Sequence, residues 1–139
     1  MRVNELSVGD IVLIDGKPTR IDAVHLRKVG WHSRKDKLAW TRIGLVRPIP
    51  LTSEILEQNG FKKFNFSDIE GQHQWTWWLD TLTSVSLWCR ELNDNPKEGW
   101  MVRIDSPLAS HCSKVEFLHQ LQQTQRLCGI DKEITIKED

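Results

Sequence analysis

Histidine and cysteine are the side chains of this chain that are best suited to hold a metal ion. His111 and Cys112 are neighbours, and the other candidates are His119, Cys89 and Cys128. Zinc sites use ligands at spacings such as CxxC or HxxxH, and neither spacing occurs here. The sequence therefore predicts no metal site. We interpret Cys89 and Cys128 as small core residues and Cys112 as a residue that flanks a helix.

Catalysis by a nucleophile requires a general base within hydrogen-bond reach. Ser110 precedes His111 and Asp105 precedes Ser106, but adjacency in sequence does not assemble a catalytic triad. The chain contains no GxSxG, P-loop, GxGxxG or HExxH motif. We therefore expect a non-catalytic protein without a cofactor, and a small enzyme of unknown class is an alternative.

Basic residues are concentrated in one segment. Residues 17–47 contain nine Lys and Arg and two Asp, a net charge of +7, and the rest of the chain carries −7 because the whole chain sums to zero. Lys and Arg neutralise phosphates, and Trp stacks on unpaired bases. One candidate function is therefore a nucleic-acid-binding accessory protein, with contacts from Arg27, Lys28, Trp31, Arg34, Lys35, Lys37, Trp40 and Arg42. The alternative is a solvated basic loop that pairs with the acidic half of the chain or with a partner protein.

The chain has seven Trp and no Tyr. Residues 75–80 and 85–90 alternate as strands, and a hairpin with residue 77 opposite 87 makes Trp78 and Trp88 diagonal neighbours on one face. Trp is enriched at binding hot spots. We predict a partner interface at Trp78, Trp88 and Arg90, and a protein-interaction module, with self-association included, ranks first among the functions. The alternative, which is favoured because contiguous exposed apolar patches are rare on monomers, is that a helix covers this face and buries both Trp residues.

The first 26 residues predict a β-hairpin. Ile11 to Ile14 is an apolar run, and Asp15-Gly16 is the signature of a two-residue turn in which both residues have a positive φ. Pro18 in the return strand favours an edge position. This opening resembles the first hairpin of an SH3-like barrel. We expect residues 27–42 to be a long loop or a distorted strand pair, followed by a strand from Ile43 to Val46.

Two helices are predicted from their capping signals. Thr52 suits the N-cap and Gly60 the C′ position of a short helix over residues 53–58. A second helix over residues 113–128 begins with the capping box Ser113-x-x-Glu116 and ends before Gly129. On this helix we place His119 on the polar side.

The order of elements favours the α+β class with a mostly antiparallel sheet, and a further strand over residues 99–105. At 139 residues, the chain has the length of a single domain. Within it, residues 1–47 are barrel-like, and residues 48–139 are an α+β part that shares the core. No apolar run is long enough to span a bilayer, and the N-terminus lacks the apolar region of a secretory signal. With three Cys in no regular spacing, we expect reduced thiols and a cytoplasmic protein.

Three blocks of the sequence carry a family resemblance. They are Leu6-x-x-Gly9, the block Pro48-Ile49-Pro50-Leu51-Thr52-x-Glu54-Ile55-Leu56 that leads to Gly60-Phe61, and His119-Gln120-Leu121-Gln122. The chain resembles a family of small uncharacterised proteins of gut-type bacteria and their phages and mobile elements. The resemblance implies a bacterial or mobile-element origin and brings no catalytic residue, cofactor or substrate. The Trp-rich strands look peculiar to this member.

Overall fold

A computed structural model describes residues 2–33, 37–65, 73–89 and 99–136 of the chain. Over these residues the structure consists mainly of antiparallel strands with two α-helices, in agreement with the predicted α+β class. The chain divides into two compact units, which we call the N-terminal unit (residues 1–49) and the C-terminal unit (residues 50–137). The boundary between the units lies two residues after the expected one at residue 47. That the two parts form a single domain with a shared core stays a prediction.

The N-terminal unit begins with a 3-10 turn (Val3–Glu5) and the predicted hairpin. Strand β1 (Ile11–Ile14) pairs antiparallel with β2 (Lys17–Arg20), and Asp15 and Gly16 form the turn with φ angles of 52° and 73°. These positive φ values are those that a type I′ turn requires. On its other side β1 pairs with β6 (Val46–Arg47), so that β2 is an edge strand, as Pro18 predicts.

A second three-stranded sheet follows in the N-terminal unit. It is formed by β3 (Ala23–His25), β4 (Lys28–His32) and β5 (Leu38–Arg42), and a 3-10 turn (Ile43–Leu45) leads into β6. Of the two alternatives for residues 27–42, the structure has the strand pair, β4 with β5, and not the long loop. The strand expected from Ile43 to Val46 begins only at Val46, because residues 43–45 form the 3-10 turn. Residues 28–32 and 38–42 form a regular antiparallel pair because Val29 and Trp31 alternate toward the core between the outward Lys28, Gly30 and His32.

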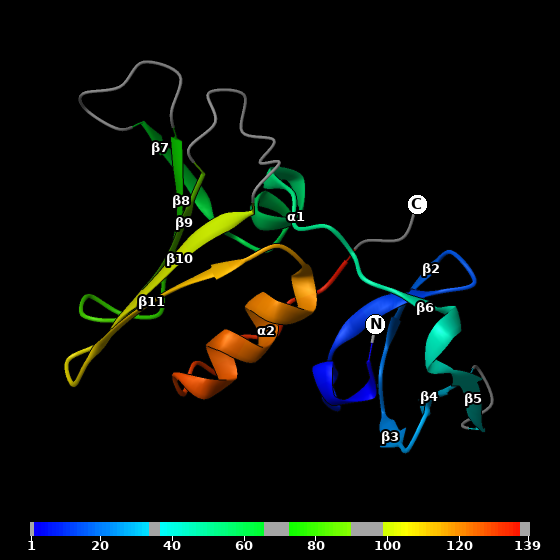
Figure 1. The fold of residues 1–139 in the computed structure, drawn as a ribbon. Helices are drawn as coiled ribbons and strands as arrows, with labels where there is room; N and C mark the ends of the chain where they lie inside the picture. Colours follow the sequence, from blue (N-terminus) through cyan, green and yellow to red (C-terminus); the bar gives the residue numbers. More distant parts are fainter. Residues whose placement is uncertain (1, 34–36, 66–72, 90–98, 137–139) are drawn as a thin grey trace. The chain divides into compact units, whose positions relative to one another are not determined.

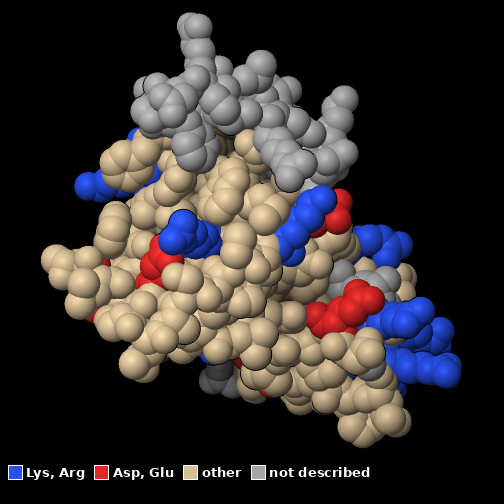
Figure 2. Space-filling model, turned by 60° about the vertical axis from the view of Figure 1, so that its left-hand side comes forward, with Lys and Arg blue, Asp and Glu red and all other residues tan. Residues whose placement is uncertain are grey.

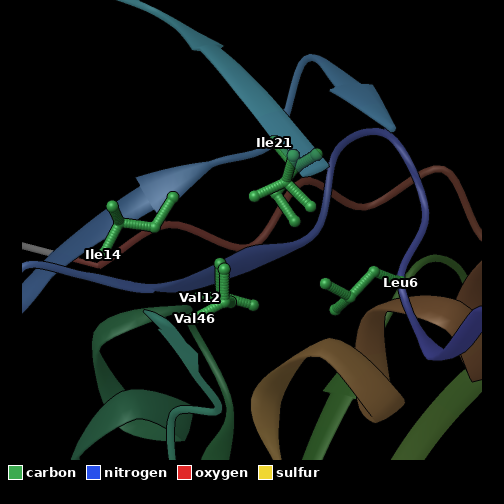
Figure 3. Packing of buried hydrophobic residues seen from close by; sticks show 6 residues of the cluster. Leu6, Val12, Ile14, Ile21 and Val46 are labelled. Atoms are coloured by element: carbon green, nitrogen blue, oxygen red, sulfur yellow. The ribbon is translucent and has the colours of Figure 1, made fainter. Parts of the chain in front are cut away.

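The core of the N-terminal unit is formed by aliphatic side chains from both sheets and the loops between them. Figure 3 shows Val12 and Ile14 of β1 lying near Val46 of β6, with Leu6 and Ile21 beside them. Val12 and Ile21 are fully buried. This small core fixes the β3–β4–β5 sheet, and the outer face of that sheet is free to carry polar and aromatic residues.

The C-terminal unit is built on one five-stranded antiparallel sheet. Its spatial order is β11–β10–β9–β8–β7, a simple meander. The strands are β7 (Lys62–Asn65), β8 (His73–Trp78), β9 (Ser84–Trp88), β10 (Trp100–Asp105) and β11 (Ser110–Val115). Figure 1 shows α1 and α2 on the same side of this sheet.

Helix α1 (Ser53–Gln58) has the predicted bounds and both predicted caps. The Thr52 hydroxyl accepts a hydrogen bond from the Ile55 backbone N–H at 3.3 Å. At the other end Gly60 has a φ of 87°, and the Phe61 N–H donates to the Leu56 carbonyl at 3.0 Å. This is a Schellman ending, in which Leu56 and Phe61 are also the buried apolar contact.

Helix α2 (Leu118–Leu127) begins later than predicted. Residues 113–115 belong to β11, where Val115 is buried opposite Trp100, so pairing in the sheet overrides the local capping signal of Ser113 and Glu116. The cap is supplied instead by the Gln120 side chain, whose Oε1 accepts from the Glu116 and Phe117 backbone N–H groups. The predicted ending at Gly129 is confirmed, with a φ of 74°.

The covered side of the five-stranded sheet is centred on two tryptophans. Trp75 and Trp100 meet edge to face with ring centroids 5.4 Å apart, and the Trp100 indole N–H donates to the Leu51 carbonyl at 2.8 Å. After α2 the chain returns to the end of α1. There the Asn59 side chain exchanges two hydrogen bonds of 2.8 Å with the Thr135 backbone.

Candidate binding surfaces

The outer face of the β3–β4–β5 sheet presents the basic residues of the N-terminal unit. Lys28 lies directly opposite Arg42, and Gly30 lies directly opposite Trp40, in the antiparallel register of β4 and β5. Because side chains alternate along a strand, these four residues share one face. Val29 and Trp31 point to the other face, toward the core.

The Trp40 ring covers the glycine across from it. A Cβ placed on Gly30 would lie 3.2 Å from the Trp40 ring and 3.2 Å from the Leu38 side chain. Trp40 is nevertheless 44% exposed. Sequence reasoning did not single out Gly30, although a glycine inside an alternating strand is the usual signal for such a close approach.

Two cations, Lys28 and Arg42, face each other beside this ring. Among the described residues, neither Lys28 nor Arg42 has a carboxylate partner. Like charges placed directly opposite on a sheet are destabilising, by up to roughly 1 kcal/mol. A shallow pocket is formed here by Lys28, Trp40, Thr41, Arg42 and Leu45, and a second one by His25, Leu26, Arg27 and Lys28. We call the surface formed by Lys28, Trp40 and Arg42 the basic face, and Arg27 lies next to it in the turn before β4.

The structure brings together only part of the predicted nucleic-acid contact set. Trp31 packs against the core, on the side of the sheet opposite to Trp40, because its position alternates with that of the outward residues. Lys37 is exposed next to β5, and Arg34 and Lys35 lie outside the described residues. Arg20 and Arg47 belong to the other sheet of the unit. The basic segment is therefore divided between two sheets rather than projecting as one arm.

At the far end of this sheet, the residue before β3 contacts the last residue of β4. The Asp22 carboxylate accepts from the His32 backbone N–H at 2.7 Å and lies 2.8 Å from the His32 ring Nδ1. The backbone hydrogen bond, followed by that of the ring, holds the pKa of Asp22 below its usual value. The Asp22 carboxylate at this end of the sheet is therefore already hydrogen-bonded to His32.

The predicted register of the Trp-rich hairpin is wrong by two residues. Trp77 pairs with Val85, and Trp75 pairs with Leu87. The turn is tighter than expected because Asp80 Oδ1 accepts from the Leu82 and Thr83 backbone N–H groups at 2.8 Å. The shift keeps Trp78 and Trp88 on one face, but they now lie four residues apart along the strands, roughly 13 Å.

Trp78 and Trp88 nevertheless lie on the side of the five-stranded sheet that faces away from α1 and α2. We call this side the open face. Trp78 is 57% exposed and Phe64 is 49% exposed, whereas Trp88 is half-buried. Figure 2, which turns the left-hand side of Figure 1 forward, shows a broad surface with few charged side chains. Arg90 lies outside the described residues.

The candidate metal ligands are not brought together. His111 and Cys112 are successive residues of β11, so their side chains point to opposite faces of the sheet. His119 is buried on α2, which corrects its expected place on the polar side. Burial raises the pKa of the Cys128 thiol. Among the residues that the structure describes, no group of three or more His, Cys, Asp or Glu is placed to hold a metal ion.

None of the described helices has the length and apolar character needed to cross a membrane. Comparison of the chain with protein-family models, curated proteins and solved structures finds no match. The functional interpretation therefore depends on the geometry of the two surfaces.

Proposed function

We propose that the chain is a non-catalytic binding module of bacterial or mobile-element origin. Its N-terminal unit is an SH3-like barrel that contacts single-stranded nucleic acid through the basic face. The barrel assignment is supported by the pairing of the first strand with the last, β1 with β6, and by the 3-10 turn at Ile43–Leu45 that precedes β6. Two small sheets around one aliphatic core are what such a barrel requires.

The observation that carries the nucleic-acid proposal is the arrangement of Lys28, Trp40 and Arg42. An exposed indole ring lies next to two cations that have no carboxylate partner among the described residues. Proteins that bind single strands combine stacking on aromatic rings with basic side chains that follow the phosphates. A bound phosphate also removes the repulsion between Lys28 and Arg42, which face each other directly.

Fluorescence anisotropy of a labelled oligothymidine over a series of salt concentrations tests the proposal. Removing two phosphate contacts with Lys28→Ala and Arg42→Ala lowers the salt slope by about 1.4, since each contact contributes roughly 0.7 for single strands. Trp40→Ala weakens binding by roughly 10-fold or more through lost stacking, and Trp40→Phe keeps most of it. The matched control, Lys17→Ala with Lys62→Ala, removes the same charge from other sheets and keeps both slope and affinity.

Native protein that shows no binding at low salt overturns the nucleic-acid proposal. An equal loss of affinity in the control variant does the same, because it reports net charge rather than a site.

A second candidate function is contact with a protein partner through the open face, supported by the exposed rings of Phe64 and Trp78. Large aromatic side chains are enriched at the hot spots of protein interfaces. A photo-crosslinking amino acid in place of Trp78 is expected to give a discrete adduct with a protein in the cells of origin, whereas the same probe in place of Lys17 gives none. Equal labelling from both positions contradicts this candidate.

A further inference from the structure

The two edges of the five-stranded sheet differ in how they are protected. Edge strands expose unpaired backbone N–H and C=O groups, and native proteins guard them with lysines, prolines, bulges or short length. Strand β7 has four residues, of which Lys62 and Lys63 are two. Strand β11 has six residues and one lysine, Lys114, and it pairs with β10 along its whole length without a bulge. Of the two edge strands, β11 is therefore the one with fewer features that prevent pairing with another strand.

The outer side of β11 is uncovered over most of its length. The Ser110, His111, Cys112 and Lys114 side chains are all exposed. Beyond Val115 the edge is closed, because the Leu51 N–H donates to the Glu116 carbonyl at 3.2 Å and Pro50 forms a bridge with Phe117. Before that point no described strand pairs with the outer edge of β11.

We propose that a second copy of this chain pairs with this edge, β11 against β11, to form one continuous antiparallel sheet around a two-fold axis at Cys112. Strand addition of this kind derives its affinity from main-chain hydrogen bonds, which both copies offer equally. The inference concerns the C-terminal unit and does not depend on the function proposed for the basic face.

Charge complementarity favours a second copy of the chain as the partner of β11, and it favours the register with the two-fold axis at Cys112. With the axis at Cys112, Ser110 lies directly opposite Lys114 of the second copy. The Ser110 hydroxyl donates to Asp105 Oδ1 at 2.6 Å, so the incoming lysine meets a carboxylate whose other neighbour is Arg103, at 3.0 Å. An axis at Lys114 would place two lysines directly opposite each other, which is unfavourable.

The same register places Cys112 of one copy opposite Cys112 of the other. Residues directly opposite in antiparallel strands have Cβ atoms about 5 Å apart, close enough for mild oxidation to join the two thiols. Residue 110 is about 13 Å from residue 110 of the second copy in this arrangement, since four residue positions separate them. Cysteine at position 110 is therefore a matched control for cysteine at position 112.

Sedimentation and oxidative crosslinking of the full chain test the proposal. We expect the native chain to sediment as a dimer, and oxidation to give a covalent dimer through Cys112. The Ser110→Cys variant in a Cys112→Ser background is expected to remain dimeric and to crosslink at least 10-fold more slowly. Cys112→Lys places two lysines opposite each other at the axis and yields a monomer, while Cys112→Ser keeps the dimer.

Three results would overturn the proposal. The first is that the native chain stays monomeric at every concentration. In that case the edge of β11 would pair with an extended segment of a different protein and not with a second copy. The second is a dimer that survives Cys112→Lys with unchanged affinity, because the contact then lies elsewhere. The third is equal crosslinking at positions 110 and 112. Circular dichroism and thermal melting of each variant separate lost association from lost folding, since residue 112 is exposed.

Discussion

Trp40 lies across the strand from Gly30, and its ring occupies the space that a side chain at position 30 would take. The ring is thus held against the backbone of β4 while its outer surface stays in solvent. A rigid exposed indole loses little conformational freedom when a flat ligand stacks on it, which is the reason that aromatic anchors are effective in binding sites.

The Gly30→Ala substitution is expected to destabilise the N-terminal unit and to displace the Trp40 ring. The new Cβ would lie 3.2 Å from Trp40 and 3.3 Å from the Ala39 carbonyl oxygen, so we expect a loss of about 1–3 kcal/mol. Gly44→Ala is the matched control, because a Cβ there meets nothing within 4 Å. Chemical denaturation monitors stability, and a Gly30→Ala protein as stable as the control would contradict the packing described.

The Gly99→Ala substitution is expected to be more damaging than Gly129→Ala. Both glycines have a positive φ, 88° and 74°, which disfavours any other residue by about 1 kcal/mol or more. At Gly99 a Cβ would also lie 2.8 Å from the Val115 carbonyl oxygen, whereas at Gly129 it meets nothing within 4 Å. The difference in unfolding free energy between the variants measures the clash, and similar values would argue against the close approach of β10 and β11.

Replacing Trp100 by Phe is expected to cost about 2 kcal/mol or more. The substitution removes the indole N–H that binds the Leu51 carbonyl and leaves that buried oxygen without its donor. Trp78→Phe serves as the comparison, since Trp78 is exposed and its replacement should change stability by less than about 0.5 kcal/mol. Comparable losses in the two variants would show that Trp100 does not have this role.

Acid unfolding should report the hydrogen bonds of Asp22. Its pKa in the folded protein lies below the value of 3.8 that holds in the unfolded chain, so the contact contributes fully above that pH and is lost as the pH falls through the lowered folded value. We expect Asp22→Asn to flatten the fall in stability below pH 3.8. Asp131→Asn, at an exposed position, is the control, and identical acid profiles for the native chain and Asp22→Asn would exclude the contact.

Elements whose signals are local were predicted well. The turn at Asp15-Gly16 and both caps of α1 depend on residues within a few positions of each other, and each has the expected conformation. For residues 27–42 the sequence left a loop and a strand pair open, because the outward positions of the strands mix Lys28 and Arg42 with Gly30 and Trp40. The alternation is recognisable only once Val29 and Trp31 are assigned to the core.

Features that depend on distant partners were missed. Ser113 and Glu116 fit the pattern of a capping box, but the six residue pairs between β10 and β11 place Ser113 in a strand. The hairpin register was wrong because the Asp80 side chain tightens the turn, a contact that spacing alone does not reveal. The basic face could be predicted in part, since Lys28, Trp40 and Arg42 were candidates, but the inward position of Trp31 required the fold.

The clasp between Asn59 and Thr135 joins the end of the first helix to nearly the last described part of the chain. During synthesis the C-terminal unit therefore completes only once Ile134 and Thr135 have emerged, after α1 and the five-stranded sheet that precede them in the chain. A chain interrupted before this point lacks the buried Ile134 side chain and leaves Asn59 without its Thr135 partner, and apolar surface exposed in this way attracts chaperones and proteases. The packing at the end of α1 therefore depends on a residue 76 positions further along the chain.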